Sequence, residues 1–259
     1  MSRLHHPKAG FWIRFCVALL YPLDALLFKI RWRGLEKIPA EGGVILAVNH
    51  ISHIDTILMA RLVWQSGRIP RFLIKSGVFG KPIVGRVMTG AGQIPVYRGT
   101  TDAHKSLLAS ADALRRGECV VIYAEGTITR DPDWWPMQGK TGIARLALTV
   151  PETPIIPIGQ WGAQFTLDSG RRRFRPFPRQ TALASVGDPV DLGRFYAAEP
   201  SVLVLREMTS AIMSAVRNEV AELRGEPAPS EFYRGPGRQS GRDEIVDQAV
   251  PGDGPASTP

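Results

Sequence analysis

The sequence predicts an α/β domain with a mixed, mostly parallel sheet that is flanked by helices. Short apolar, β-branched runs typical of buried strands alternate along the chain with longer runs of helical periodicity. Polar residues directly follow several of the apolar runs, as they do where α/β proteins place their sites. The 259 residues are enough for one substantial domain with accessory segments.

Residues 11–30 are the most hydrophobic stretch of the chain. Charged residues interrupt it, Pro22 breaks or kinks it, and its longest uncharged run is about half of what a membrane-spanning helix needs. It also lacks the small-residue cleavage pattern of a signal peptide. Aromatic and aliphatic residues with cations at both ends favour a helix or helical hairpin lying at a membrane surface. A helix packed on the protein's own core is the alternative.

The sheet domain begins with a strand at 29–33 and a continuously apolar strand at 44–48. Ser52 is the expected N-cap of a helix that runs to about Trp64, which places Asp55 in the first turn of that helix. The remaining strands are expected at 71–75, 93–97, 119–123, 155–159 and 182–186, and the remaining helices at 82–88, 102–116, 143–149 and 200–224.

The chain divides into three expected segments: membrane-associating helices at 1–30, a folded domain at 31–225 and a disordered tail at 226–259. The tail contains 11 Pro or Gly among its 34 residues, and few of the others are large and apolar. The tail is acidic, so the rest of the chain carries 29 basic and 18 acidic residues. Such a basic body favours an anionic partner, either a membrane surface or nucleic acid. The two distant cysteines, Cys16 and Cys119, indicate neither a disulfide framework nor a zinc site.

A histidine and an aspartate follow the 44–48 strand at short spacing. Asn49 and His50 come directly after the strand, and Asp55 lies five positions after His50. Across a tight strand-to-helix turn, the carboxylate can hold the imidazole, which is how a general base is oriented. His53 is expected to be exposed or to serve local packing. Polar clusters also follow later predicted strands, at Lys75, 92–98 and 125–127. Because the ends of parallel strands converge, these clusters are expected to share one cleft with His50.

In chain order these blocks resemble the glycerolipid acyltransferases, specifically the 1-acylglycerol-3-phosphate O-acyltransferases. The resemblance covers about residues 30–190. It is carried by Asn49-His50-x-Ser52-x-x-Asp55, by Lys75 through Gly92-Gln93-Ile94-Pro95-Val96-Tyr97-Arg98, by Tyr123-Ala124-Glu125-Gly126-Thr127 and by Pro154-Ile155-Ile156-Pro157-Ile158. The family usually has Phe-Pro before Glu-Gly-Thr, and an arginine directly after the threonine. In this chain Tyr123-Ala124 precedes that motif, and Ile128 and Thr129 stand before Arg130.

The resemblance implies a membrane-peripheral enzyme at the cytoplasmic face of the cell membrane. It would move a fatty acyl group from acyl-CoA or acyl carrier protein to lysophosphatidate, forming phosphatidate in phospholipid biosynthesis. His50 would be the base and Asp55 its orienting group, and no metal or cofactor beyond the thioester donor is expected. The acceptor phosphate would be bound by Lys75, Arg98, the 125–127 turn (Glu125 orienting a cation or the turn, the Gly126 and Thr127 amides facing the anion) and Arg130 or Lys140, with motif support from Asn49, Ser52 and Gly92.

Several alternatives stay open at this point. The acceptor could instead be glycerol 3-phosphate or a glycolipid hydroxyl, and a non-catalytic lipid-binding protein would also explain the basic body. Nucleic-acid binding is permitted by the charge, but no recognition motif supports it. Arg98 could be a structural ion-pair partner, and Trp134 and Trp135 could pack in their loop, reach the bilayer or line an acyl groove. The arginines at 171–179 fit either a solvated loop or a contact with anionic headgroups.

Overall fold

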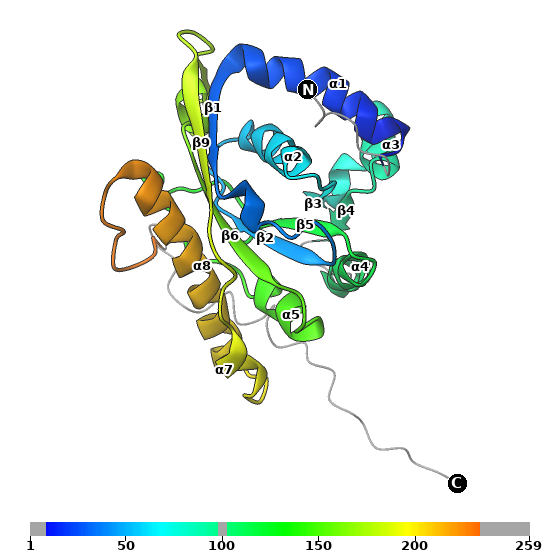
Figure 1. Ribbon diagram of the computed structural model, residues 1–259, viewed down its shortest axis with the longest axis vertical. Coiled ribbons are helices and arrows are strands. Elements are labelled where there is room, and N and C mark those ends of the chain that lie inside the picture. The colour runs from blue at the N-terminus through cyan, green and yellow to red at the C-terminus, as the bar shows by residue number, and fades with distance from the viewer. Residues whose placement is uncertain (1–8, 98–102, 234–259) are drawn as a thin grey trace.

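A seven-stranded sheet forms the centre of the protein in a computed structural model that describes residues 9–97 and 103–233 (Figure 1). All seven strands expected from the sequence are present. In spatial order they are β1 (Phe28–Arg33), β9 (Gln180–Val186), β6 (Ile155–Trp161), β2 (Val44–Val48), β5 (Cys119–Tyr123), β3 (Pro70–Lys75) and β4 (Ile94–Val96). Every neighbouring pair is parallel except β6 and β9, which are antiparallel. The prediction of a mixed, mostly parallel sheet is therefore confirmed.

The expected helices are also present, and shorter elements accompany them. The longer helices are α1 (Phe11–Leu27), α2 (Asp55–Gln65), α3 (Pro82–Gly90), α4 (Ala103–Arg115), α5 (Gly142–Thr149) and α8 (Val202–Arg224). The short elements are η2 (Leu35–Lys37), η3 (Ser76–Val78), α6 (Ala163–Thr166), β7 (Leu167–Asp168), β8 (Arg173–Phe174) and α7 (Gly193–Tyr196). The sequence did not predict these short elements, because two to four residues are too few to show a periodicity.

Helices cover both faces of the sheet because the strands at its centre are apolar on both sides. All five residues of β2 are fully buried. Ile45 and Ala47 pack with α4, α5 and α8, whereas Val44, Leu46 and Val48 face α2. Figure 1 shows α1 lying across the outer side of α2, with α3 near one end of α1. The alternating side chains of one strand therefore hold the layers together.

One edge of the sheet gathers the strand ends that matter for a site. β6, β2, β5, β3 and β4 run parallel to one another, so their carboxyl ends lie along the same edge. β9 runs antiparallel to β6, and β1 runs parallel to β9, so the first residues of these two strands lie at this edge too. Segments that precede β1 and β9 thus reach the edge at which His50 emerges.

The N-terminal helix packs on the domain and also keeps an exposed apolar side. α1 is one helix that continues through Pro22, so the alternative of a helical hairpin is wrong for the described residues. Ile13 is buried with Trp64 of α2. Large apolar side chains nevertheless stay exposed at helical spacing on its other side. They are Phe11, Phe15, Leu19, Leu23 and Leu26, and we call them the α1 stripe.

No helix in the described part of the chain is long and apolar enough to cross a membrane. One side of α1 packs on the core, and the other side carries the α1 stripe to the surface of the protein.

The expected tail at 226–259 is ordered at its start. Phe232 packs against the core on the α8 side, and the Arg217 guanidinium lies 4.2 Å from the centre of its ring. Tyr233 forms a β-bridge with Met137. The prediction of disorder is therefore wrong for residues 226–233, because Phe232 finds apolar partners and Tyr233 a main-chain partner despite the flanking Pro and Gly. Residues 234–259 lie outside the described residues.

Candidate active site

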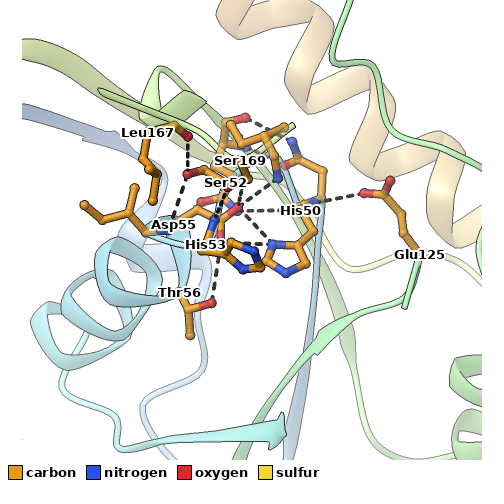
Figure 2. A network of polar contacts seen from close by, with 12 residues as sticks. His50, Ser52, His53, Asp55, Thr56, Glu125, Leu167 and Ser169 are labelled. Atoms are coloured by element: carbon orange, nitrogen blue, oxygen red, sulfur yellow. Dashed lines mark hydrogen bonds and ion pairs between the residues drawn. The ribbon is translucent and has the colours of Figure 1, made fainter. Parts of the chain in front are cut away.

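The strand-to-helix turn after β2 brings His50 and Asp55 into contact (Figure 2). The Nδ1 atom of His50 lies 3.1 Å from both carboxylate oxygens of Asp55. The Asp55 side chain is fully buried, whereas the imidazole keeps 17% of its surface exposed. With Nδ1 held by the carboxylate, Nε2 is the nitrogen that can act on a bound molecule. The geometry is that of a base with its orienting carboxylate.

The Asp55 carboxylate also shapes the turn itself. Its Oδ2 atom accepts hydrogen bonds from the main-chain N–H groups of Ile51, at 2.8 Å, and Ser52, at 2.9 Å. The helix begins at Asp55 with Ile54 as its cap residue, so the prediction of Ser52 as N-cap is wrong. Because the chain wraps around the carboxylate first, the Ser52 hydroxyl turns away and donates to the Leu167 carbonyl at 2.7 Å.

An aromatic ring supports the imidazole from one side. The rings of His50 and Tyr123 are stacked with their centres 4.3 Å apart and their planes 24° from parallel. Burial and the nearby Asp55 carboxylate raise the pKa of Tyr123, so its hydroxyl stays protonated near neutral pH. Tyr123 is one of the two positions at which this chain departs from the usual Phe-Pro pair, and its ring is the aromatic group that contacts the histidine in this structure.

Glu125 connects the histidine to a loop that lies far away in sequence. One of its oxygens accepts a hydrogen bond from the His50 N–H at 2.9 Å, and the other accepts one from the Met137 N–H at 3.0 Å. The carboxyl group is almost fully buried, and this burial raises its pKa to about 8. Both oxygens are engaged by the main chain, so Glu125 holds the turn and does not face a phosphate.

The Glu125→Gln substitution is expected to remove part of the pH dependence of stability. The folded-state pKa of Glu125, about 8, lies above its ordinary value of 4.5, so the folded chain retains a proton that the unfolded chain releases in this window. The free energy of unfolding therefore falls as the pH rises from about 4.5 to about 8. Glutamine does not titrate, so the fall should be smaller in the variant.

Urea unfolding at several pH values measures this difference, with Glu41→Gln, at an exposed glutamate, as the matched control. Asp24, whose pKa burial raises to about 7, contributes a fall of the same sign in every variant. The comparison between variants is therefore the test. Equal pH slopes in the wild type and Glu125→Gln would show that Glu125 does not titrate in this window.

The rest of the 125–127 turn lies under a lysine. Gly126 has a φ of +72°, and a Cβ atom there would come within 3.2 Å of the Cδ and Cε atoms of Lys140. The Lys140 N–H donates to the Ala124 carbonyl at 2.8 Å, which fixes the lysine beside the turn. The Gly126 N–H donates to the Tyr123 carbonyl at 2.9 Å, so the expectation that this amide faces an anion is wrong. Thr127 is exposed next to it.

The other two predicted cations that the structure describes, Lys75 and Arg130, are exposed. Lys75 is exposed at the end of β3, on the sheet edge that carries His50. The Arg130 side chain is exposed, and its main-chain N–H donates to the Met137 sulfur at 3.3 Å. Arg98 lies outside the described residues. Gly92 has a φ of +66°, and a Cβ atom there would collide with the Arg71 guanidinium, so its role in the described structure is packing.

Asn49 joins the end of β2 to the end of β6. Its side chain accepts from the Gln160 N–H at 2.8 Å and donates to the Gln160 carbonyl at 3.1 Å. The Gln160 side chain in turn donates to the Asn49 carbonyl at 2.6 Å. Sequence reasoning missed Gln160. A polar residue directly after a predicted strand was the signal that singled out Asn49, and Gln160 stands in the same position after the predicted 155–159 strand.

Two loop segments beside the site were also missed. Thr129 donates its N–H to the His50 carbonyl at 2.7 Å, and its hydroxyl donates to the Trp135 carbonyl at 2.7 Å. Ser169 accepts the His53 N–H at 3.0 Å (Figure 2).

Trp135 is buried, and the Arg224 guanidinium lies 4.1 Å from its ring and 4.4 Å from that of Trp161. Within the described structure, packing in the loop is therefore the role of Trp135.

The sequence of the chain is similar to those of known proteins. The family model described as Acyltransferase matches residues 29–161, half of the chain. A chloroplastic 1-acyl-sn-glycerol-3-phosphate acyltransferase of Arabidopsis thaliana is 28% identical over 170 residues, which are 62% of this chain and 45% of that protein. A Bacillus subtilis protein named 1-acyl-sn-glycerol-3-phosphate acyltransferase is 24% identical over 79% of this chain and 94% of its own length. The chain thus spans less than half of the Arabidopsis relative.

A solved structure has the same fold. The crystal structure of the 1-acyl-sn-glycerophosphate acyltransferase of Thermotoga maritima superposes with a TM-score of 0.62 at 20% sequence identity. The superposition covers 84% of this chain and 81% of the other.

Proposed function

The chain belongs to the acyltransferase family, and from this premise we propose that it is a 1-acylglycerol-3-phosphate O-acyltransferase. It transfers a fatty acyl group from a thioester of CoA or acyl carrier protein to the free hydroxyl of lysophosphatidate, and the product is phosphatidate. The observation that carries this proposal is the contact of His50 Nδ1 with the buried Asp55 carboxylate at the carboxyl end of β2. Two named relatives with this activity support the choice of acceptor.

The proposed mechanism needs one base and no enzyme nucleophile. His50 Nε2 takes the proton of the acceptor hydroxyl as its oxygen attacks the thioester carbonyl carbon. The Asp55 carboxylate holds the Nδ1 proton and stabilises the imidazolium that forms. When the tetrahedral intermediate collapses, the carbon–sulfur bond breaks, and the imidazolium returns its proton to the leaving thiolate. The stack on Tyr123 and the Glu125 bond to the His50 main chain hold the base in place.

The acceptor phosphate is proposed to lie beside the 125–127 turn. Lys140 packs over Gly126, next to the residue that holds the His50 main chain, and its ammonium group supplies positive charge there. We assign the phosphate clamp to Lys140, with Lys75 and Thr127 on the same edge of the sheet and Arg98 completing the set. Arg130 is proposed to contribute less, because its main chain is turned toward Met137.

The Lys140→Ala substitution is expected to lower kcat/KM for lysophosphatidate by about 10- to 100-fold, mainly through KM. This corresponds to the loss of one charge-assisted hydrogen bond, worth about 1.5–3 kcal/mol. Arg130→Ala serves as the matched control and should change kcat/KM by less than about threefold. With monoacylglycerol, which has no phosphate, the two variants should not differ. The opposite ranking with lysophosphatidate would assign the clamp to Arg130.

The membrane surface is the proposed place of the reaction. The α1 stripe exposes five large apolar side chains, with Phe11 at 71% and Leu19 at 59% of full exposure. Exposed Ile83 and Val84 on α3 lie on the helix that contacts α1. Such a surface suits an interfacial helix that buries one side among the acyl chains. The basic body favours the anionic cytoplasmic leaflet.

A labelled acyl-CoA and a labelled acyl carrier protein, each offered with a panel of acceptors, test the proposed reaction. The panel contains lysophosphatidate, glycerol 3-phosphate, a glycolipid and monoacylglycerol, and the ester product is identified. Phosphatidate should dominate. A dominant product from glycerol 3-phosphate or the glycolipid would replace the proposed acceptor, and the absence of ester with every acceptor, while lipid still binds, would favour a lipid-binding protein.

A further inference from the structure

The β7–β8 hairpin and the loop after it carry the densest positive charge of the described chain. Five of the nine residues at 171–179 are arginine. They are Arg171, Arg172, Arg173, Arg175 and Arg179, and all five are exposed. Among the described carboxylates, Asp168 alone forms an ion pair with one of them, a contact of 3.6 Å with Arg171. The reaction proposed above makes no use of this charge.

Large apolar side chains stand between the arginines. Phe174 is 56% exposed and Phe177 is 65% exposed, and Phe165 at the base of the hairpin is 43% exposed. In a loop that faced water alone, two exposed phenylalanines among five cations would gain no free energy from burial. The combination suits an anionic membrane surface, where arginines meet the headgroups and aromatic rings enter the boundary of the acyl chains.

The hairpin adjoins the end of α1, which places it next to the α1 stripe. It leads directly into β9, whose first residue, Gln180, pairs with Phe28, the first residue of β1 after α1. The Arg179 guanidinium donates a hydrogen bond to the Phe28 carbonyl. In Figure 1 the yellow-green segment before β9 projects beyond the sheet beside the start of β1 and the end of α1. A surface that receives the exposed Leu26 of α1 would therefore also meet the hairpin.

Hydrogen bonds tie the hairpin to the turn that carries His50. The Ser52 hydroxyl donates to the carbonyl of Leu167 in β7, and the His53 N–H donates to the hydroxyl of Ser169. Ser52 and His53 lie between His50 and Asp55, so the hairpin is attached within the proposed catalytic turn itself (Figure 2). A lipid surface bound by the hairpin would thus hold a defined position relative to the base.

We propose that the β7–β8 hairpin is a second membrane-contact element, in which the arginines at 171–175 bind anionic lipid headgroups and Phe174 and Phe177 enter the interface. The proposal extends the membrane location proposed for α1 and assigns the choice of anionic lipid to the hairpin. The α1 stripe provides affinity for any bilayer, because it carries apolar residues and no charge. A membrane is favoured over nucleic acid because the arginines lie next to the exposed apolar side of α1.

Binding of the full chain to sedimenting vesicles tests the proposal. One vesicle type contains phosphatidylcholine alone, and the other contains phosphatidylcholine with about a third phosphatidylglycerol. The hairpin variant replaces Arg171, Arg172, Arg173 and Arg175 with glutamine. The charge-matched control makes the same change at four exposed arginines elsewhere on the surface. They are Arg115 at the end of α4, Arg116 directly after it, Arg194 in α7 and Arg206 in α8.

The hairpin variant should bind anionic vesicles about 1,000-fold more weakly than the wild type, from about 1 kcal/mol for each of the four arginines near an anionic surface. Its binding to phosphatidylcholine should be unchanged, and the loss should shrink at high salt. The control should change binding to either vesicle by less than about threefold. The Phe11→Ser/Phe15→Ser/Leu19→Ser variant of the α1 stripe should instead weaken binding to both vesicles.

A single substitution separates loss of binding from loss of folding. Arg172 has a φ of +52°, which glycine adopts without strain, so Arg172→Gly should leave the thermal unfolding midpoint unchanged or raise it. It should weaken binding to anionic vesicles about fivefold.

Equal losses of vesicle binding in the hairpin variant and the control would overturn the proposal, and so would unchanged vesicle binding of the hairpin variant. If the hairpin variant kept its vesicle binding but lost binding to single-stranded RNA, the arginines would be assigned to nucleic acid instead. The measurement uses no acyl donor or acceptor, so its outcome is independent of whether the chain transfers acyl groups.

Discussion

Replacing His50 with alanine is expected to abolish acyl transfer and to leave the fold intact. The imidazole is the group that accepts the hydroxyl proton, and general bases of this kind contribute about 10²–10⁴-fold to a rate. The side chain is partly exposed, and Asp55 is its charged partner among the described residues, so its removal leaves the packing of β2 unchanged. We expect kcat to fall by at least about 10³-fold, with lysophosphatidate and vesicle binding retained.

His53→Ala is the matched control for this substitution. His53 lies three residues away on the same turn, and its side chain is exposed. Its contact with Ser169 uses the main-chain N–H, which alanine keeps. Activity near the wild-type level is therefore expected. Initial rates with saturating thioester measure both variants, and substantial turnover by His50→Ala would remove the histidine from the mechanism.

Replacing Asp55 with asparagine is expected to lower kcat by about 10³–10⁴-fold without unfolding the turn. An asparagine oxygen in the place of Oδ2 can still accept the main-chain N–H groups of Ile51 and Ser52. Its NH₂ group then faces His50 Nδ1 in the place of Oδ1. A donor there requires Nδ1 to accept, which moves the ring proton to Nε2 and removes the base.

Asp55→Ala separates the two tasks of the carboxylate. Alanine leaves two buried main-chain N–H groups without an acceptor, so it should lower both activity and the thermal unfolding midpoint. Asparagine should lower activity alone. Rates and unfolding curves for the two variants give the comparison. An Asp55→Asn variant that works as fast as the wild type would show that the carboxylate only shapes the turn.

The larger elements of the fold follow from local pattern. β2 was predictable because five consecutive apolar residues with no polar interruption suit a strand that is covered on both faces. α8 was predictable from the residues along it and at its two ends. The Ser201 hydroxyl accepts the Val204 N–H at its start, and Gly225 ends it at a φ of +67°. Apolar periodicity and caps act within a few residues, so they can be recognised without the fold.

The misplaced features depend on partners elsewhere in the chain. Ser52 has the chemistry of an N-cap, but the Asp55 carboxylate binds the local N–H groups and the serine finds Leu167 instead. Phe232 lies among Pro and Gly that are typical of disorder, yet it packs on the core and under Arg217. Composition alone does not show which distant surface is available to a residue.

The candidate site divides along the same line. His50 and Asp55 are five residues apart, so one turn brings them together, and the sequence was sufficient to predict that they meet. The groups that hold this pair come from far away: Glu125 is 75 residues from His50, Gln160 is 111 from Asn49, and Leu167 is 115 from Ser52. Those contacts exist because parallel strands place their carboxyl ends on one edge and because β9 runs in the opposite direction to β6. Strand order and direction are properties of the assembled sheet, so local sequence predicted the base, whereas the assembled sheet alone shows what holds the base in position.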